Sequence, residues 1–192
     1  MKKLLAACAV LLALGLGACT KPASFQNTDV TGLRYAEDFA LTDHNGVPRN
    51  LASFKGKVVL VFFGYTQCPD VCPTTMVELA KVMQELGPLA DKLQVLFITV
   101  DPERDTQELL AQYVPAFNPN FIGLRGDAAA TAKVAKEFKV FYAKSPGSTP
   151  ESYSMDHTAG SYVFDTEGKI RLFVRHGKGA TPIAQDIKLL LH

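Results

Sequence analysis

The stretch that decides the fold reads Val58-Val59-Leu60-Val61-Phe62-Phe63-Gly64-Tyr65-Thr66-Gln67-Cys68-Pro69-Asp70-Val71-Cys72-Pro73. Its first six residues are all apolar, a pattern typical of a central strand covered by helices on both faces. Beyond this stretch, apolar residues recur at helical spacing until Gly87 and Pro88. We therefore predict a buried strand that passes directly into a helix, with two cysteines at the transition.

Strand and helix patterns alternate along the rest of the chain. We predict further strands at residues 93–100, 121–124 and 140–143, helices at 105–113, 128–138 and 183–191, and hairpins within 35–51 and 161–174. The helix at 105 begins with a variant of the capping box, and residues 144–154, rich in Pro, Gly and Ser, are expected to form a mobile loop. This order predicts one α/β domain with a mixed central sheet flanked by helices and an N-terminal hairpin.

The composition is that of an ordinary globular protein with no excess of either charge. Of 192 residues, 47% are hydrophobic and 20% are charged, which excludes a disordered or collagen-like chain. The formal net charge is +1, and it falls to about −1 once Lys2 and Lys3 are removed with the segment described next. Because no basic surface remains for phosphate backbones, we expect no nucleic-acid binding.

The N-terminal residues are typical of a secretion signal that ends in a lipid-attachment site. A basic start is followed by an apolar run from Leu4 to Ala18, shorter than the roughly 20 residues of a membrane span. The run ends in Leu16-Gly17-Ala18-Cys19, which resembles the bacterial lipobox. We expect a signal peptide, then a lipidated N-terminus and linker, then the folded domain, at residues 1–18, 19–33 and 34–192. Lipid on Cys19 would hold the domain on the extracytoplasmic side of a bacterial membrane; an uncleaved anchor is the alternative.

Two of the four cysteines remain for the folded domain. Cys8 leaves with the signal and Cys19 carries the lipid, which leaves Cys68 and Cys72. In an oxidising compartment such a pair forms a disulfide or is kept reduced for a purpose, and a purely structural disulfide is disfavoured because its loop is small. The start of a helix stabilises thiolates, and residues four apart on a helix share a face, so that both sulfurs can bind one metal ion.

A metal site here needs a third ligand, because two thiolates alone seldom satisfy a metal ion. Of the four histidines, His157 is the best placed, whereas His44, His176 and His192 are expected to have no role in binding. The cysteine pair at a strand-to-helix transition resembles the motif of thioredoxin-like enzymes, which have two residues between their cysteines where this chain has three. In the sheet of such enzymes, the segment before the late hairpin lies opposite the start of the active-site helix. His157 lies in this segment. Residues 158–161 lack the proline that thioredoxins have there, which leaves room for an imidazole.

The chain resembles the Sco/SenC family in three motifs: Gly64-Tyr65-Thr66 running into Cys68-Pro69-Asp70-Val71-Cys72-Pro73, Val100-Asp101-Pro102-Glu103-Arg104-Asp105-Thr106, and Asp156-His157-Thr158. The resemblance covers roughly residues 30–190 and implies a membrane-tethered, thioredoxin-like protein. It also implies copper binding by Cys68, Cys72 and His157, and delivery of copper to the copper A site of cytochrome c oxidase. This chain has Thr158 where the family commonly has serine, and a predicted lipid anchor where other members use a transmembrane helix.

The donor set agrees with that resemblance on chemical grounds. Two thiolates and one imidazole suit Cu(I), which accepts low coordination numbers, whereas zinc usually takes a fourth ligand. We therefore expect a copper metallochaperone, a carrier rather than a turnover enzyme, with Cu(II) as a second candidate ion. The expected partners are the copper-bearing subunit of cytochrome c oxidase, other copper chaperones and thiol reductases.

Two other functions remain open from the sequence. The first is an extracytoplasmic thiol-disulfide oxidoreductase, in which Cys68 and Cys72 form the catalytic pair and keep the recipient's cysteines reduced. The second is a copper-independent redox sensor whose disulfide state alters a contact with a partner. A carrier needs His157 for its copper affinity, whereas a dithiol reductase does not, so this residue separates the carrier from the reductase.

Several side chains near these motifs have less certain roles. Met76 and Met83 lie on the apolar stripe of a predicted helix and are expected in the core. Met155 is a weaker candidate for an auxiliary copper contact. Asp70 is either a solvated turn residue or a group that tunes the thiolates. Asp156 either caps its loop or orients His157.

Overall fold

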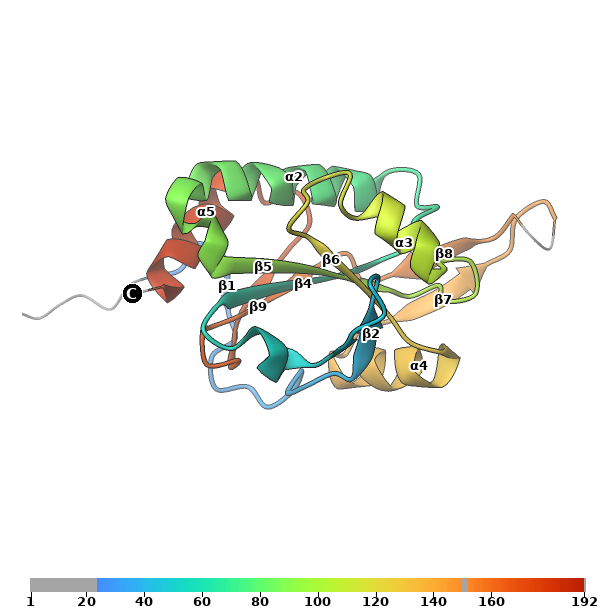
Figure 1. The fold of residues 1–192 in the computed structure, drawn as a ribbon, viewed down its shortest axis with the longest axis horizontal. Coiled ribbons are helices and arrows are strands. Elements are labelled where there is room, and N and C mark those ends of the chain that lie inside the picture. The colour runs from blue at the N-terminus through green and yellow to red at the C-terminus, as the bar shows by residue number, and fades with distance from the viewer. Residues whose placement is uncertain (1–23, 150–151, 192) are drawn as a thin grey trace, which may run out of the picture.

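The computed structural model describes residues 24–149 and 152–191, so the predicted signal peptide and the lipid-attachment site Cys19 lie outside the described residues. Its centre is an eight-stranded sheet in the order β1-β10-β9-β4-β5-β6-β2-β3, and β7 and β8 form a separate antiparallel pair (Figure 1). The strands are β1 (Thr28–Asp29), β2 (Leu41–Asp43), β3 (Pro48–Arg49), β4 (Val58–Gly64), β5 (Leu93–Thr99), β6 (Ile122–Arg125), β7 (Tyr142–Ser145), β8 (Ser154–His157), β9 (Ser161–Phe164) and β10 (Ile170–Val174). The α-helices are α2 (Val71–Leu86), α3 (Gln107–Tyr113), α4 (Ala128–Glu137) and α5 (Ala180–Leu190), and η1 (Leu51–Phe54) and η2 (Gly87–Lys92) are 3₁₀ helices.

The sheet is mixed, as the sequence predicts. β4 pairs parallel with β5, and β5 pairs parallel with β6, whereas β4 pairs antiparallel with β9. Helices α2 and α5 lie along one face of the sheet and α4 lies against the other (Figure 1). All seven residues of β4 are buried, because this strand is central and covered on both sides.

Helix α2 carries the second cysteine in its first turn. It begins at Val71, so that Pro73 lies in the first turn, where a missing backbone N–H costs nothing. Its buried residues recur at helical spacing and face the sheet and α5. It ends at Leu86 and is followed by Gly87 at the C-cap, whose φ of +55° favours glycine over other residues. The predicted strand-to-helix transition is therefore confirmed, and the helix begins at Val71 rather than after Pro73.

The predicted N-terminal hairpin is present as β2 and β3, and three other expectations need correction. Thr28 and Asp29, expected in an irregular linker, form β1 on the edge of the sheet beside β10. The predicted strand at 140–143 does not join the central sheet, because residues 142–145 pair with β8, so that the expected loop at 144–154 begins and ends in the strands of a hairpin. The cap of α3 is Thr106 rather than Asp105, since the Thr106 side chain accepts the N–H of Leu109.

Asp186 joins the N-terminal segment to helix α5. Its carboxylate is 1% exposed and accepts hydrogen bonds from the backbone N–H groups of Gln26 and Asn27, and from the Asn27 side chain, at 2.8–3.1 Å. A buried carboxylate is tolerated only where donors surround it. This contact extends the folded unit to residues that the sequence analysis assigned to the linker.

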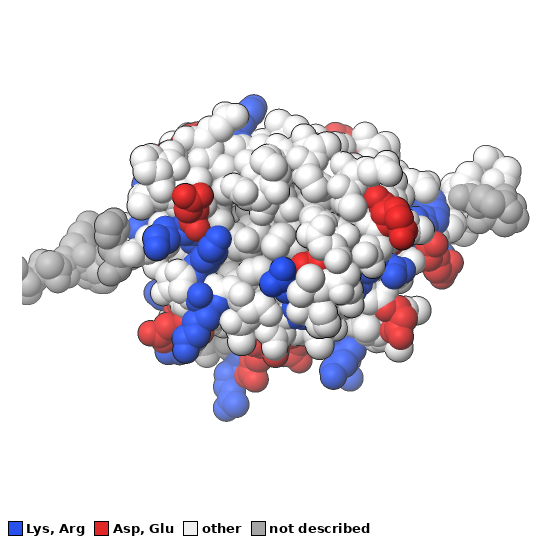
Figure 2. All heavy atoms as spheres, viewed as in Figure 1, with Lys and Arg blue, Asp and Glu red and all other residues white. Residues whose placement is uncertain are grey.

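The surface of the domain shows no concentration of one charge on the face in view. Figure 2 shows Lys and Arg side chains interspersed with Asp and Glu side chains. Among the described residues, none of the helices combines the length and the apolar character that a membrane crossing requires.

We predict that Asp186→Ala lowers the free energy of unfolding by about 1–3 kcal/mol, because several buried donors lose their acceptor. Urea denaturation measures the change. The neighbouring Gln185→Ala, which removes only an exposed side-chain contact to Gln26, is the control, with an expected change below about 0.5 kcal/mol. Equal stability of the two variants would contradict the anchoring role of Asp186.

Candidate metal centre

Cys68 and Cys72 meet at the end of β4. Cys68 is half-buried in the loop that follows the strand, and Cys72 is fully buried in the first turn of α2. Both thiols are free, and the backbone N–H of Cys72 donates to the sulfur of Cys68 at 3.3 Å. The spacing of four residues therefore brings the two sulfurs together, as the sequence predicts.

Gly64 makes room for the buried sulfur. A Cβ atom on this residue would lie 2.9 Å from Sγ of Cys72 and 2.9 Å from a ring carbon of Phe97, both too close for ordinary contact. The absence of a side chain at the last position of β4 thus allows the first turn of α2 to pack directly on the strand. In the sequence, a glycine between the buried strand and the cysteines could have indicated this close packing.

His157 reaches the two sulfurs from the last position of β8. Its Nε2 atom lies 3.5 Å from Sγ of Cys72, and its Nδ1 atom lies 3.0 Å from the carbonyl oxygen of Thr158. A carbonyl only accepts, so Nδ1 carries the hydrogen and Nε2 presents its lone pair to the sulfurs. The ring packs edge-to-face against Phe62 and Tyr65, which fixes its plane.

The three side chains form a compact donor set. One ligand atom from each of Cys68, Cys72 and His157 lies within 4.8 Å of the other two, and no other such group of His, Cys, Asp or Glu occurs among the described residues. A small inward movement of each group would place one ion in contact with all three. Two sulfurs and one imidazole favour a soft ion of low coordination number over Mg²⁺ or Ca²⁺, which prefer oxygen ligands.

Burial shifts the pKa values of two of these groups in opposite directions. Desolvation raises the pKa of the Cys72 thiol well above its ordinary value, and the same cause lowers the pKa of His157. Without a metal ion, Cys72 is therefore protonated and His157 is neutral at neutral pH. The expectation that the helix start stabilises a thiolate is wrong for Cys72, because burial outweighs the favourable position.

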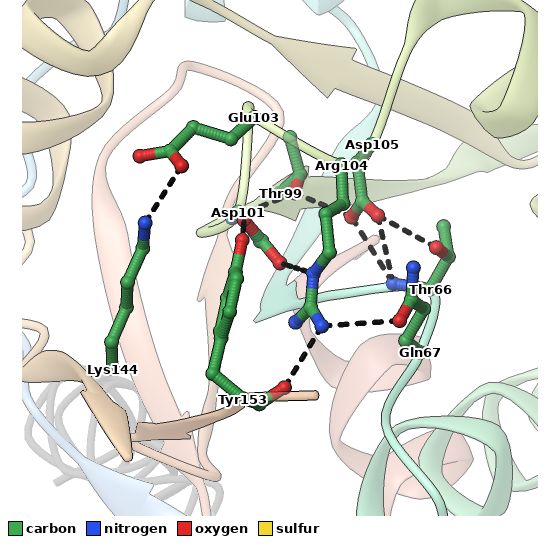
Figure 3. Close-up of polar contacts among 9 residues, drawn as sticks. All are labelled: Thr66, Gln67, Thr99, Asp101, Glu103, Arg104, Asp105, Lys144 and Tyr153. Atoms are coloured by element: carbon green, nitrogen blue, oxygen red, sulfur yellow. Dashed lines mark hydrogen bonds and ion pairs between the residues drawn. The ribbon is translucent and has the colours of Figure 1, made fainter. Parts of the chain in front are cut away.

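A set of polar contacts beside the cysteine loop was not predicted from the sequence (Figure 3). Asp105 is fully buried and accepts hydrogen bonds from the Thr66 N–H and hydroxyl and from the Thr99 hydroxyl. Burial raises its pKa, and these donors lower it in part. Asp105 thus ties the residues just before Cys68 to the end of β5. The signal was an acidic residue shortly after a buried strand, which we interpreted as the start of a helix.

Neither His44 nor His176 belongs to the donor set of the metal centre. His44 is buried, and its Nδ1 accepts the backbone N–H of Gly123 at 3.0 Å. His176 contacts the hydroxyl of Thr75 through its own Nδ1. His192 lies outside the described residues.

The methionines near the motifs are buried in the core, and the nearby acidic residues are not part of the donor set. Met76 and Met83 are buried in the core, as predicted. Met155 is also buried and shares the face of β8 that carries His157, since alternate residues of a strand point the same way. Asp70 is exposed, and its carboxylate accepts from the Thr74 hydroxyl but makes no capping hydrogen bond to the helix backbone. Asp156 is exposed and accepts from Ser145, whereas the carbonyl of Thr158 orients His157.

The chain is similar in sequence to a family model and to curated proteins of the same family. The family model SCO1/SenC matches residues 28–192. The mitochondrial SCO2 homolog of Bos taurus is 37% identical over 153 residues, which cover 79% of this chain and 58% of that protein. The chain thus spans about three fifths of the length of the curated mammalian relatives it matches.

Two solved structures show the same fold. ScoI of Bradyrhizobium japonicum, solved with copper bound, is 42% identical with a TM-score of 0.74, covering 80% of this chain and 97% of that one. A structure described as a SCO1/SenC family lipoprotein from Bacillus anthracis is 26% identical with a TM-score of 0.71, covering 83% of this chain and 97% of that one. The thioredoxin-like fold predicted from the sequence is confirmed.

We predict that iodoacetamide alkylates Cys68 before Cys72 in the reduced protein. The Cys68 sulfur is partly accessible, whereas the Cys72 thiol is buried and holds its proton. Mass spectrometry of peptides from samples quenched over time at about pH 8 measures both rates. In denaturant the two rates should become similar, and equal rates in the folded protein would contradict the difference in burial.

Proposed function

The chain belongs to the SCO1/SenC family, and from that premise we propose that it is a copper metallochaperone that binds one copper ion through Cys68, Cys72 and His157. The observation that carries the proposal is the convergence of these three ligand atoms within 4.8 Å. The copper-bound relative from Bradyrhizobium japonicum supports copper as the ion. The recipient is the copper A site of cytochrome c oxidase, which the family resemblance implies.

The positions of the ligands suit a carrier. Cys72 holds the ion from within the domain, and Cys68 and His157 are both half-buried, so that a ligand of the recipient can approach from their side. Three-coordinate Cu(I) leaves a position open for that ligand, so transfer proceeds by exchange of one ligand at a time. Transfer is favourable when the recipient binds the ion more tightly.

The proposed cellular location rests on the N-terminal sequence. Residues 1–18 act as a signal peptide, Cys19 carries lipid, and the domain beginning near residue 24 lies on the extracytoplasmic side of a bacterial membrane. The relative from Bacillus anthracis, described as a lipoprotein, supports this arrangement. An extracytoplasmic location places the cysteine pair in an oxidising environment, so copper loading requires prior reduction of the pair.

A second candidate function is thiol-disulfide exchange, and the unequal exposure of the two thiols favours it specifically. The Cys68 thiolate attacks a disulfide of the recipient and forms a mixed disulfide, releasing one recipient thiolate. Cys72 then loses its proton and attacks the Cys68 sulfur, which releases the second recipient thiolate and leaves a Cys68–Cys72 disulfide. Two electrons pass to the recipient, and an external thiol reductase restores the pair.

We predict that the reduced protein binds close to one Cu(I) per domain, and that the disulfide form binds none. Either Cys68→Ser or Cys72→Ser abolishes binding, and His157→Ala lowers the affinity by about 100-fold or more, because a direct ligand matters more than the groups that orient it. Competition with a chromogenic Cu(I) chelator measures these values, with His44→Ala as the control histidine. Unchanged affinity in His157→Ala, together with full disulfide-reducing activity, would favour the oxidoreductase instead.

We predict that Cu(I) affinity rises with pH between about 6 and 9. The raised pKa of Cys72 means that its proton must leave when the ion binds, and each released proton contributes about tenfold per pH unit. Because the pKa of His157 is lowered, protonation of the imidazole weakens binding only at more acidic pH. A dissociation constant independent of pH would contradict this prediction.

A further inference from the structure

The β7–β8 hairpin that carries His157 projects from the edge of the domain (Figure 1). Its two strands pair only with each other among the described residues. A two-stranded hairpin is marginally stable by itself, so its orientation depends on contacts with the rest of the molecule. The position of the His157 imidazole therefore depends on whatever holds this hairpin against the cysteine loop.

Arg104 contacts both the hairpin and the cysteine loop (Figure 3). One guanidinium nitrogen, Nη1, donates to the backbone oxygen of Tyr153 at 2.8 Å and to Oε1 of Gln67, next to Cys68, at 3.1 Å. Its Nε donates to the buried carboxylate of Asp101 at 2.5 Å. The planar guanidinium presents several donors in fixed directions, which lysine cannot reproduce.

Tyr153 completes the attachment from the side of the hairpin (Figure 3). Its hydroxyl donates to Asp101 at 2.8 Å, and its ring lies under the Arg104 guanidinium at 3.6 Å from the ring centroid. The ammonium group of Lys144, on β7, lies 4.6 Å from the same centroid and pairs with Glu103 at 2.7 Å. The Lys144–Glu103 pair is exposed and contributes little, whereas the Arg104 contacts are stronger, because the Arg104 side chain is only 15% exposed and that of Asp101 1%.

We propose that the Arg104–Tyr153 contact positions His157 against the two sulfurs, and thereby sets the copper affinity and the rate at which copper is released. Tyr153 immediately precedes β8 and His157 ends it, so four residues of extended strand, about 13 Å, separate the anchor from the ligand. Arg104 acts through the hairpin and is a positioning residue, not a ligand. Loss of the contact frees the hairpin to move His157 away from Cys72.

The inference rests on the proposed copper-binding function, and its test separates the two. The first measurement is hydrogen–deuterium exchange of residues 154–157 in the reduced, metal-free protein. Arg104→Lys keeps the charge beside Asp101 but loses the forked contacts, and we expect faster exchange in β8 with little change in β4 and β5. Tyr153→Leu, which removes the ring and the hydroxyl, is the second variant and should produce the same pattern.

A matched control is available at Arg171. This arginine contacts the hydroxyl of Thr31 through Nε, the carboxylate of Asp165 through Nη1 and the ring of Phe25, none of which belongs to the hairpin. Arg171→Lys therefore removes a similar set of contacts without touching β8. Its exchange at residues 154–157 should equal that of the wild type.

The second measurement is a double-mutant cycle for Cu(I) affinity. Arg104→Lys should weaken binding by about tenfold or more in the wild-type background, the usual effect of losing a group that orients a ligand. In the His157→Ala background the same change should have no effect, because the ligand that it positions is gone. An equal loss in both backgrounds, or unchanged exchange in β8, would overturn the proposal. A wild-type protein that binds no Cu(I) would instead refute the proposed function, while the exchange result would still decide whether the contact holds the hairpin.

Discussion

The structure depends on the close approach of a buried thiol and a half-buried imidazole, Cys72 and His157, whose facing atoms are 3.5 Å apart. Burial keeps a proton on the first group and removes it from the second, so that the metal-free site carries little charge inside the domain. When a metal ion binds there, the Cys72 thiol loses its proton, and the positive charge of the ion takes the place of the proton's charge. The fold supports this arrangement through Gly64, which lets the sulfur rest on β4, and through β8, which delivers the imidazole.

The parts of the fold that the sequence predicts are those with strong local patterns. The buried strand β4, the helix α2 and the N-terminal hairpin follow from apolar runs, helical spacing and turn residues. The parts that it misses depend on partners distant in the chain. Asp186 binds backbone groups 159 and 160 residues away, and Asp105 binds Thr66 across 39 residues. Such acidic residues look like ordinary polar positions until the fold brings donors around them.

The same distinction applies to the metal centre. The two cysteines were recognisable together because their spacing is local, whereas His157 lies 85 residues beyond Cys72 and was selected by its place before a predicted strand and by family resemblance. The role of the Thr158 carbonyl in orienting the ring was not predictable, since any residue offers a carbonyl. The protonation of Cys72 was also misjudged, because the favourable effect of a helix start is small compared with complete burial.

The central claim is that three side chains from two separate segments bind one soft ion together. X-ray absorption spectroscopy at the copper edge, on the reduced protein loaded with one equivalent of Cu(I), tests it most directly. The account predicts a three-coordinate ion with two sulfur neighbours and one imidazole nitrogen, and loss of the nitrogen signal in His157→Ala. A spectrum with sulfur neighbours only, unchanged by that substitution, would contradict it.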